Sequence, residues 1–323
     1  MTGKEKLNCV LNGQVPESPP HWELVFQIAK EMMGVDIEAI GQAYTGTEEA
    51  KRELLQRTEI EIQHRLIEEC DWAAVPCYSP ELAPLYKKEF GNKALIAGFD
   101  WDGVFWMPTG DNLMGFVERL FDAPEELHIE ARKKCETAKR RLTLYADNGI
   151  DFFVLAHDFG FNNAPFVSPD HFREFIAPYL AEIAQQAHAL GKKAILHSDG
   201  CLTQILDQLH ATGLDGYQSV DPQGHMDIQD VRRQYPDWIL MGNVACNMLQ
   251  DTDEAKIREC VQYCMTHGGI GKRYIFSTSN CIFKGMPPES YRIMLDEYRK
   301  LCKSMVTDAQ HAVAGYASQA RQP

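Results

Sequence analysis

The sequence is poor in long apolar runs, in phosphate-binding motifs and in positive charge. No stretch of ~18 consecutive apolar residues occurs among its 323 residues, so no membrane-spanning segment is expected. Neither GxGxxG nor GxxxxGK[ST] occurs, so there is no glycine-rich cradle for a nucleotide. Lys and Arg number 32 against 46 Asp and Glu, which gives a formal net charge of −14. A chain this acidic repels phosphate backbones, so nucleic acid is not an expected partner.

The ten cysteines lack the paired spacing of a disulfide or zinc-finger framework, and none forms a CxxC pair. The opening residues, MTGKEKLNCVLNGQ, lack the apolar core of a signal peptide. We therefore expect reduced thiols and a cytoplasmic protein. With 45% hydrophobic and 24% charged residues, the composition is that of a globular chain with a large core.

From residue 150 onward, apolar runs that end in polar residues alternate with segments of helical periodicity. The expected strands lie within residues 151–160, 192–200, 216–222, 238–245 and 273–282. The expected helices lie within residues 168–191, 202–213, 226–234, 252–269 and 287–301. Strands that alternate with helices in this way imply parallel βα units.

The first half is less regular. Strands are expected at 21–26 and 71–80, a hairpin at 93–110 and a long helix at 124–149. The total of about eight strands predicts a single (β/α)8 TIM barrel domain over residues 1–302, with an inserted hairpin and extra N-terminal helices. A doubly wound open sheet is the alternative. Residues 303–323 lose the strong apolar pattern, so we expect a partly disordered tail.

Polar side chains gather where the expected strands end, which is the edge at which barrel enzymes place their active sites. His157 and Asp158 end one strand, His197 and Asp199 end the next, and Cys281 ends the last. Imidazole, carboxylate and thiolate are all zinc ligands, and catalytic zinc uses three of them with a fourth position open. Helix capping by Asp199 and simple burial of Cys281 are the structural alternatives.

Three stretches resemble the uroporphyrinogen decarboxylase superfamily, and they lie within residues 150–300. They read FVSPDHFREFIAPYLAEIAQQAHALGKKAILHSDG, GLDGYQSVDPQGHMDIQDVRRQYPDWILMGNV and YIFSTSNCIFKGMPPESYRIM. The resemblance implies a (β/α)8 barrel. True decarboxylases carry an arginine-rich N-terminal segment that binds the acidic groups of the tetrapyrrole. The equivalent stretch here, residues 19–34, has no arginine and contains Glu23, so this clamp for carboxylates is missing.

The chain resembles more closely the cobamide-dependent methyltransferases of that superfamily. Their thiol-alkylating members hold zinc with a His-x-Cys pair and a later Cys. Here the pair reads His197-Ser198-Asp199, and the later Cys matches Cys281. A site with one thiolate is a stronger Lewis acid than one with two, which suits polarisation of an ether oxygen. The resemblance thus implies a zinc-dependent methyltransferase that moves a methyl group from a small donor, such as an aryl methyl ether, to a corrinoid protein.

On this hypothesis, zinc lies on His197, Asp199 and Cys281, while His157 or Asp158 acts as acid or orienting group. The residues expected to contact the substrate are Glu23, Tyr78, Trp101, Trp106 and Asn243. The alternatives are a metal-free decarboxylase of a smaller carboxylic acid, a methylcobamide:thiol methyltransferase, and a non-enzymatic carrier or sensor. The sequence leaves open the methyl donor, the direction of transfer and the oligomeric state, with a homodimer among the alternatives.

Overall fold

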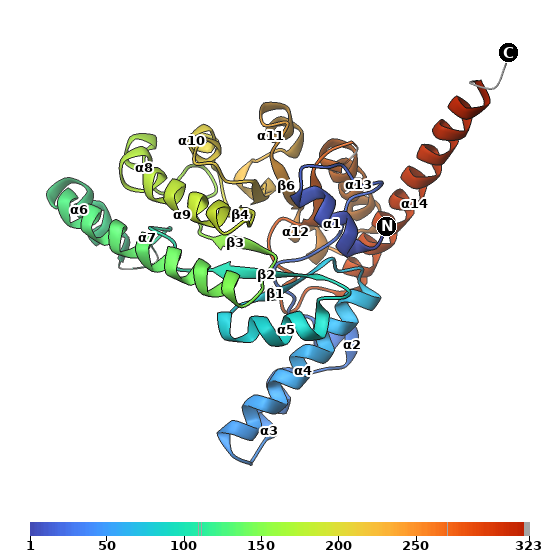
Figure 1. Cartoon of the computed structure of the whole chain (residues 1–323), viewed down its shortest axis with the longest axis horizontal. Coiled ribbons are helices and arrows are strands. Elements are labelled where there is room, and N and C mark those ends of the chain that lie inside the picture. The colour runs from blue at the N-terminus through green and yellow to red at the C-terminus, as the bar shows by residue number, and fades with distance from the viewer. Residues whose placement is uncertain (109, 111, 270, 320–323) are drawn as a thin grey trace.

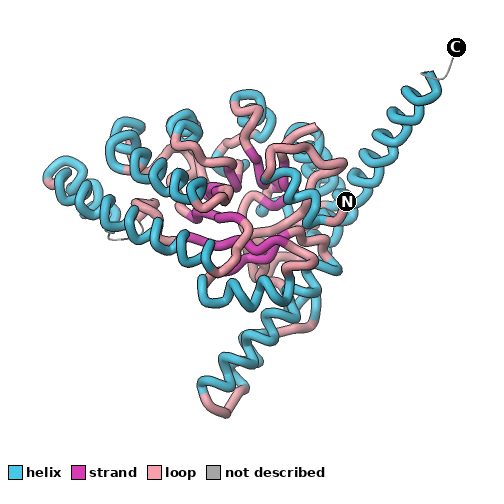
Figure 2. The backbone as a smooth tube through the Cα atoms, in the orientation of Figure 1, coloured by secondary structure: helices cyan, strands magenta, loops and turns pink. Residues whose placement is uncertain are grey.

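A curled sheet of parallel strands, covered by helices on its outer face, forms the centre of the molecule in this computed structural model (Figures 1 and 2). The structure describes residues 1–108, 110, 112–269 and 271–319. Within them, seven strands pair in chain order, every pair parallel. They are β1 (Ala74–Cys77), β2 (Leu95–Asp100), β3 (Phe152–Ala156), β4 (Ala194–His197), β5 (Gly216–Ser219), β6 (Ile239–Val244) and β7 (Tyr274–Thr278).

Every residue of these strands is buried, as expected for a parallel sheet that is covered on both faces. The apolar runs therefore mark the strands without alternation. The helices before β3 are α1 (Gly3–Leu11), α2 (Ala29–Met33), α3 (Ile37–Ala43), α4 (Glu48–Glu69), α5 (Ala83–Phe90), α6 (Asn112–Asp122) and α7 (Pro124–Asp147). Those after it are α8 (Pro169–Phe175), α9 (Ala177–Ala189), α10 (Leu206–Ala211), α11 (Ile228–Gln234), α12 (Cys246–Gln250), α13 (Glu254–Cys264) and α14 (Pro288–Gln319).

Residues 20–26 close the ring between β7 and β1. The Trp22 N–H donates to the Phe276 carbonyl at 3.1 Å, and the Ala73 N–H donates to the His21 carbonyl at 2.8 Å. Phe26 makes a further parallel bridge to Ile282. The segment stands where an eighth strand is expected, but it forms isolated bridges at His21 and Phe26 and no continuous ladder. The fold is therefore an α/β, TIM-barrel-like fold.

The inserted hairpin predicted for residues 93–110 is not confirmed. β2 pairs in parallel with both neighbours, and residues 101–108 contain no strand. The aromatic residues that suggested hairpin alternation instead pack together after the strand, where the Trp101 ring stacks on Phe99 with 5.4 Å between centroids. Burial between two parallel neighbours satisfies the apolar run of β2 without an antiparallel partner.

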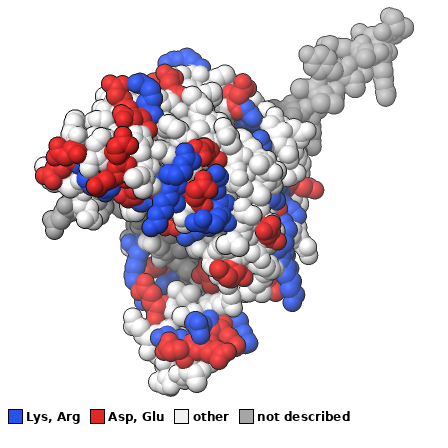
Figure 3. Space-filling model, turned by 60° about the vertical axis from the view of Figure 1, so that its left-hand side comes forward, with Lys and Arg blue, Asp and Glu red and all other residues white. Residues whose placement is uncertain are grey.

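The predicted extra N-terminal helices include α3 and α4, which form an arm that projects from the barrel (Figure 1). α14 projects on another side and continues past residue 302, the expected domain boundary. The boundary and the partly disordered tail stay predictions, and residues 320–323 lie outside the described residues. Acidic and basic side chains lie interspersed on the face in Figure 3. No helix in the described chain is long and apolar enough to cross a membrane.

Glu23 fastens the closing segment to the end of β7. Its fully buried carboxylate accepts hydrogen bonds from Ser277 Oγ at 2.9 Å, from the Thr278 N–H at 2.9 Å and from Thr278 Oγ1 at 2.7 Å. His21 Nε2 lies 3.2 Å from its other oxygen. A buried carboxylate is tolerated only when its acceptors are used in this way, so Glu23 is part of the barrel closure.

Replacing Glu23 by alanine is expected to lower the free energy of unfolding by about 3 kcal/mol, because it leaves the buried Thr278 N–H without an acceptor and removes the bonds from the Ser277 and Thr278 hydroxyls. Urea unfolding measures the change. The control is Glu118→Ala on the exposed side of α6, for which we expect less than about 0.5 kcal/mol. Equal midpoints for the two variants would contradict the closing role of Glu23.

Candidate metal centre

Asp158, His197 and Asp199 converge beyond the ends of β3 and β4. Each offers a ligand atom, and these atoms lie within 4.8 Å of one another. Asp158 Oδ1 is 3.6 Å from His197 Nε2 and accepts the Asp199 N–H at 3.0 Å. The two strands are parallel neighbours with Ala156 opposite His197, so the polar residues that end them meet at one edge.

Gln218 on β5 orients the ring of His197. The Gln218 amide nitrogen donates to the carbonyls of Thr278 at 3.3 Å and Ser279 at 3.4 Å, while its Oε1 contacts His197 Nδ1. Because the amide nitrogen is committed to carbonyl acceptors, Oε1 must accept, and Nδ1 must carry the proton. In the neutral form of the ring, the lone pair is therefore on Nε2, which faces Asp158. This is the form in which a histidine binds a metal, with its second nitrogen held by an outer hydrogen bond.

One carboxylate oxygen of Asp199 is buried, and the hydroxyl of Ser219 is the donor beside this side chain. Asp199 Oδ1 has no hydrogen-bond partner among the described residues, while Oδ2 accepts from Asn280 Nδ2. Burial raises the pKa of Asp199 to about 6, with His197 opposing the rise and Asp158 adding to it. A buried oxygen without a hydrogen bond is costly, and a second carboxylate nearby adds repulsion. A cation between the three side chains removes both costs.

Gly200 lets the chain turn away directly after Asp199. Its φ is +82°, and a Cβ there would lie 2.3 Å from the Gly160 carbonyl oxygen. The Gly200 N–H donates to Asp221 Oδ2 at 3.1 Å. The loops that follow β3, β4 and β5 therefore pack backbone against backbone, which fixes Asp199. Val220 has a φ of 48°, which a β-branched residue rarely adopts, so backbone strain is present beside the centre.

Cys281, the third predicted zinc ligand, is not in the group of converging ligand atoms. It follows β7 and is half-buried, and burial raises the pKa of its thiol to about 12, with Cys246 and Asp199 adding to the rise. The structure thus brings together two of the three predicted ligands. It adds Asp158, which the sequence suggested as acid or orienting group.

His157 and Asn243 have other partners. His157 Nε2 lies 3.2 Å from Asp100 Oδ2, and both side chains are fully buried. Asn243 Nδ2 donates to the carbonyls of Val220 and Met226, and its Oδ1 accepts from the Cys264 thiol. Sequence reasoning missed Asp100, whose position at the end of β2 was the available signal. It also missed Gln218 as the partner of His197.

The residues predicted to contact substrate fall into two groups. The oxygens of Glu23 are already bonded in the barrel closure. Tyr78, Trp101 and Trp106 follow β1 and β2 and are 46%, 43% and 44% exposed. The Tyr78 and Trp101 rings lie 6.0 Å apart. These three aromatic rings are free to contact a ligand, whereas Glu23 and Asn243 are held by the protein.

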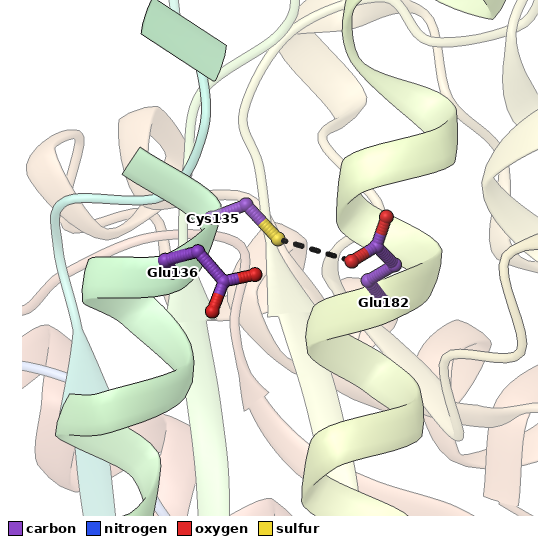
Figure 4. Close-up of side chains that lie close together, drawn as sticks. All are labelled: Cys135, Glu136 and Glu182. Carbon is purple, nitrogen blue, oxygen red and sulfur yellow. Dashed lines mark hydrogen bonds between the residues drawn. The ribbon is translucent and has the colours of Figure 1, made fainter. Parts of the chain in front are cut away.

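A second cluster, Cys135 and Glu136 on α7 with Glu182 on α9, also brings three ligand atoms within 4.8 Å (Figure 4). Its carboxylates are already paired with cations. Glu182 lies 2.6 Å from Arg132, and Glu136 lies 3.0 Å from Lys139. Burial raises the pKa of the Cys135 thiol to about 11. Two cations this close repel a metal ion, so the cluster joins α7 to α9 and is not a metal site.

Residues 104–301 match the family model described as uroporphyrinogen decarboxylase (URO-D). The chain belongs to the uroporphyrinogen decarboxylase family. A methyltransferase from Methanosarcina mazei has a similar fold, with a TM-score of 0.73 and 14% identity over 93% of this chain and 99% of that one. No curated protein sequence matches the chain.

Two further structures in the comparison are less similar. A sugar phosphate isomerase/epimerase from Parabacteroides distasonis ATCC 8503 has a TM-score of 0.47 and 10% identity over 87% of this chain and 93% of that one. An L-ribulose 3-epimerase has a TM-score of 0.46 and 13% identity over 83% of this chain and 95% of that one.

Asp199→Asn is expected to stabilise the chelator-treated protein at pH 7.5. A carboxyl whose pKa is raised in the folded state contributes its full stability below pH ~4 and loses it as pH rises through about 6. The asparagine variant has no such loss, so its unfolding free energy should exceed that of the native chain by about 2 kcal/mol at pH 7.5 and by almost nothing at pH 3.5. Urea unfolding at both values measures this. A pH-independent difference would contradict the buried state of the carboxyl.

Proposed function

We propose that this chain is a zinc-dependent methyltransferase that transfers a methyl group from a small methylated donor to a corrinoid carried by a partner protein. The observation that carries the proposal is the convergence of Asp158, His197 and Asp199 at the rim of a barrel of this family. The Methanosarcina methyltransferase with a similar fold supports the choice of reaction class.

The residues fit zinc. One imidazole nitrogen with a free lone pair and two carboxylates make three protein ligands, which leaves a fourth position for the substrate. His197 Nε2, Asp199 Oδ1 and Asp158 would hold the ion. When bound, it supplies Lewis-acid polarisation of the oxygen that leaves the methyl group. Cys281, the third ligand predicted from the sequence, stays an alternative to Asp158. Zinc analysis of variants at each of the two residues distinguishes them.

The protein's own side chains position this chemistry. Gln218 fixes the ring of His197, and Asn280 holds Asp199 Oδ2 so that Oδ1 stays available. The Asp158 side chain is 35% exposed and faces the mouth of the centre. The cobalt that accepts the methyl group belongs to the partner's cofactor. We include His157 as an orienting group, because it directly precedes Asp158 in the chain and its ring is held 3.2 Å from the buried Asp100 carboxylate.

An aryl methyl ether suits the exposed aromatic rings that follow β1 and β2, and the one adjacent to the centre is Trp106, whose chain neighbour Met107 donates its N–H to the Asp158 carbonyl at 2.7 Å. Tyr78, Trp101 and Trp106 offer faces for an aromatic ring. A polycarboxylate tetrapyrrole suits the site poorly, because residues 19–34 contain no arginine and two carboxylates stand at the centre. A cytoplasmic location stays a prediction, as does the oligomeric state.

A second candidate is a metal-free decarboxylase of a small carboxylic acid. The observation in its favour is the Asp199 pKa of about 6, which makes a protonated carboxyl accessible near neutral pH. Against it stands the repulsion between two carboxylates and an anionic substrate. Activity that survives a strong chelator would favour this candidate, as it would rule out zinc-dependent transfer.

His197→Ala is expected to retain less than a tenth of the zinc that the native chain binds, because it removes the neutral nitrogen donor. The measurement is elemental analysis after dialysis, with His210→Ala on the exposed side of α10 as matched control. Stoichiometric zinc in His197→Ala would remove the proposed centre. Asp158→Asn should lose zinc while Cys281→Ala keeps it, and the reverse result would restore Cys281 as the third ligand.

Purified protein mixed with a reduced corrinoid, Co(I), and a panel of methoxylated aromatics and methylamines should form methylcobamide with at least one donor. The reaction should stop when zinc is removed and resume when zinc is returned. Absorbance of the corrinoid measures it. Carbon dioxide release from small acids in the presence of chelator, without methyl transfer, would contradict the proposal.

A further inference from the structure

A cavity of about 480 Å³ lies between α4, the segment that follows the barrel closure, and the β1 region. Pro76 of β1 lines it, together with Trp72 before the strand and Tyr78 directly after it. Ile62 and Leu66 of α4 form the opposite wall. None of the three residues of the candidate metal centre lines this cavity, so it is a separate place in the fold.

Two acceptors on α4, Glu59 and Gln63, line the cavity side by side. Gln63 is 5% exposed, and its amide nitrogen donates to Glu59 Oε1 at 2.8 Å, one turn earlier on α4. A carboxylate only accepts, so the amide must present its nitrogen to Glu59. Gln63 Oε1 is then left buried with no donor among the described residues. A ligand that brings N–H groups satisfies this oxygen and the carboxylate together.

The charge of the lining is also unbalanced. Lys30 lies 2.8 Å from Asp36, and Lys284 lies 2.7 Å from Glu38, so both lysines of the lining are paired at its mouth. Glu59 has no ion pair within the described chain. A cationic ligand would neutralise the negative charge of Glu59, whereas an anionic ligand would be repelled by it.

Three aromatic residues line the same cavity as Glu59. Trp72 and Tyr86 are buried, and the Tyr78 ring is half exposed. Burial raises the pKa of both tyrosines, and the negative charge of Glu59 adds to the rise, which places this carboxylate near both hydroxyls. Aromatic faces beside a carboxylate favour an ammonium group through cation–π attraction. The volume is within the range of small-molecule sites.

We propose that this cavity binds a small organic ammonium compound. The ammonium donates to Glu59 and to Gln63 Oε1, and the apolar body packs against Trp72, Ile62 and Leu66. A neutral hydrocarbon leaves Gln63 Oε1 unsatisfied, and a bare metal ion finds one carboxylate and one amide oxygen, too few ligands to hold it. The inference does not depend on the proposed methyl transfer.

Isothermal titration of the native chain with three probes that share a phenylethyl group and differ in the charge of the end group tests the proposal. We expect 2-phenylethylamine to bind at least tenfold more tightly than 2-phenylethanol, and 3-phenylpropionate not to bind, because a charge-assisted hydrogen bond is roughly twice as strong as a neutral one. Glu59→Gln should weaken the amine at least tenfold and leave the alcohol unchanged. Glu61→Gln, an exposed position on the same helix, is the matched control and should bind like the native chain.

Several results would overturn the proposal. They are equal affinity for amine and alcohol, no heat with the amine at millimolar concentration, and unchanged amine binding in Glu59→Gln with a native circular dichroism spectrum. His197→Ala should bind the amine as the native chain does, since the metal centre is separate. Loss of amine binding in that variant would show that the amine occupies the metal centre instead.

Discussion

Crowding of two carboxylates and one imidazole nitrogen at the barrel rim is the constraint on which the candidate centre depends. The lone pair of His197 Nε2, the buried Asp199 Oδ1 and the half-exposed carboxylate of Asp158 occupy one small volume. Water screens such a set poorly where it is buried, and the raised pKa of Asp199 records the cost. A bound cation is the simplest group that satisfies all three at once.

The rest of the fold holds this arrangement in place. Parallel pairing of β3 with β4 sets Ala156 opposite His197, so that Asp158, two residues further along, lies near the His197 ring. The close approach of Gly200 to Gly160 and the bond from Gly200 to Asp221 hold Asp199 at the turn. On the far side, Glu23 joins the closing segment to β7, and the carbonyls beyond that strand hold Gln218, which orients His197. The barrel closure and the candidate centre are therefore linked through the end of β7.

The sequence predicts the strands well where an apolar run ends in polar residues, as in KKAILHSDG, because burial between parallel neighbours requires such runs. It misleads at residues 93–110, where aromatic alternation suits a hairpin and a strand followed by a packed loop equally well. The residue type does not determine in which direction a side chain at the end of a strand points. His157 and Asp158 are adjacent, yet one pairs with Asp100 and the other meets His197. Glu59 and Gln63 come to line a cavity only when α4 packs near β1, and no local sequence pattern predicts that packing.

Anomalous diffraction at the zinc edge, from crystals of the protein grown with equimolar zinc, tests the central claim most directly. The account predicts one strong peak about 2.1 Å from His197 Nε2, with Asp158 and Asp199 oxygens at about the same distance. A peak on the cluster of Cys135, Glu136 and Glu182, or no peak between β3 and β4, would contradict it.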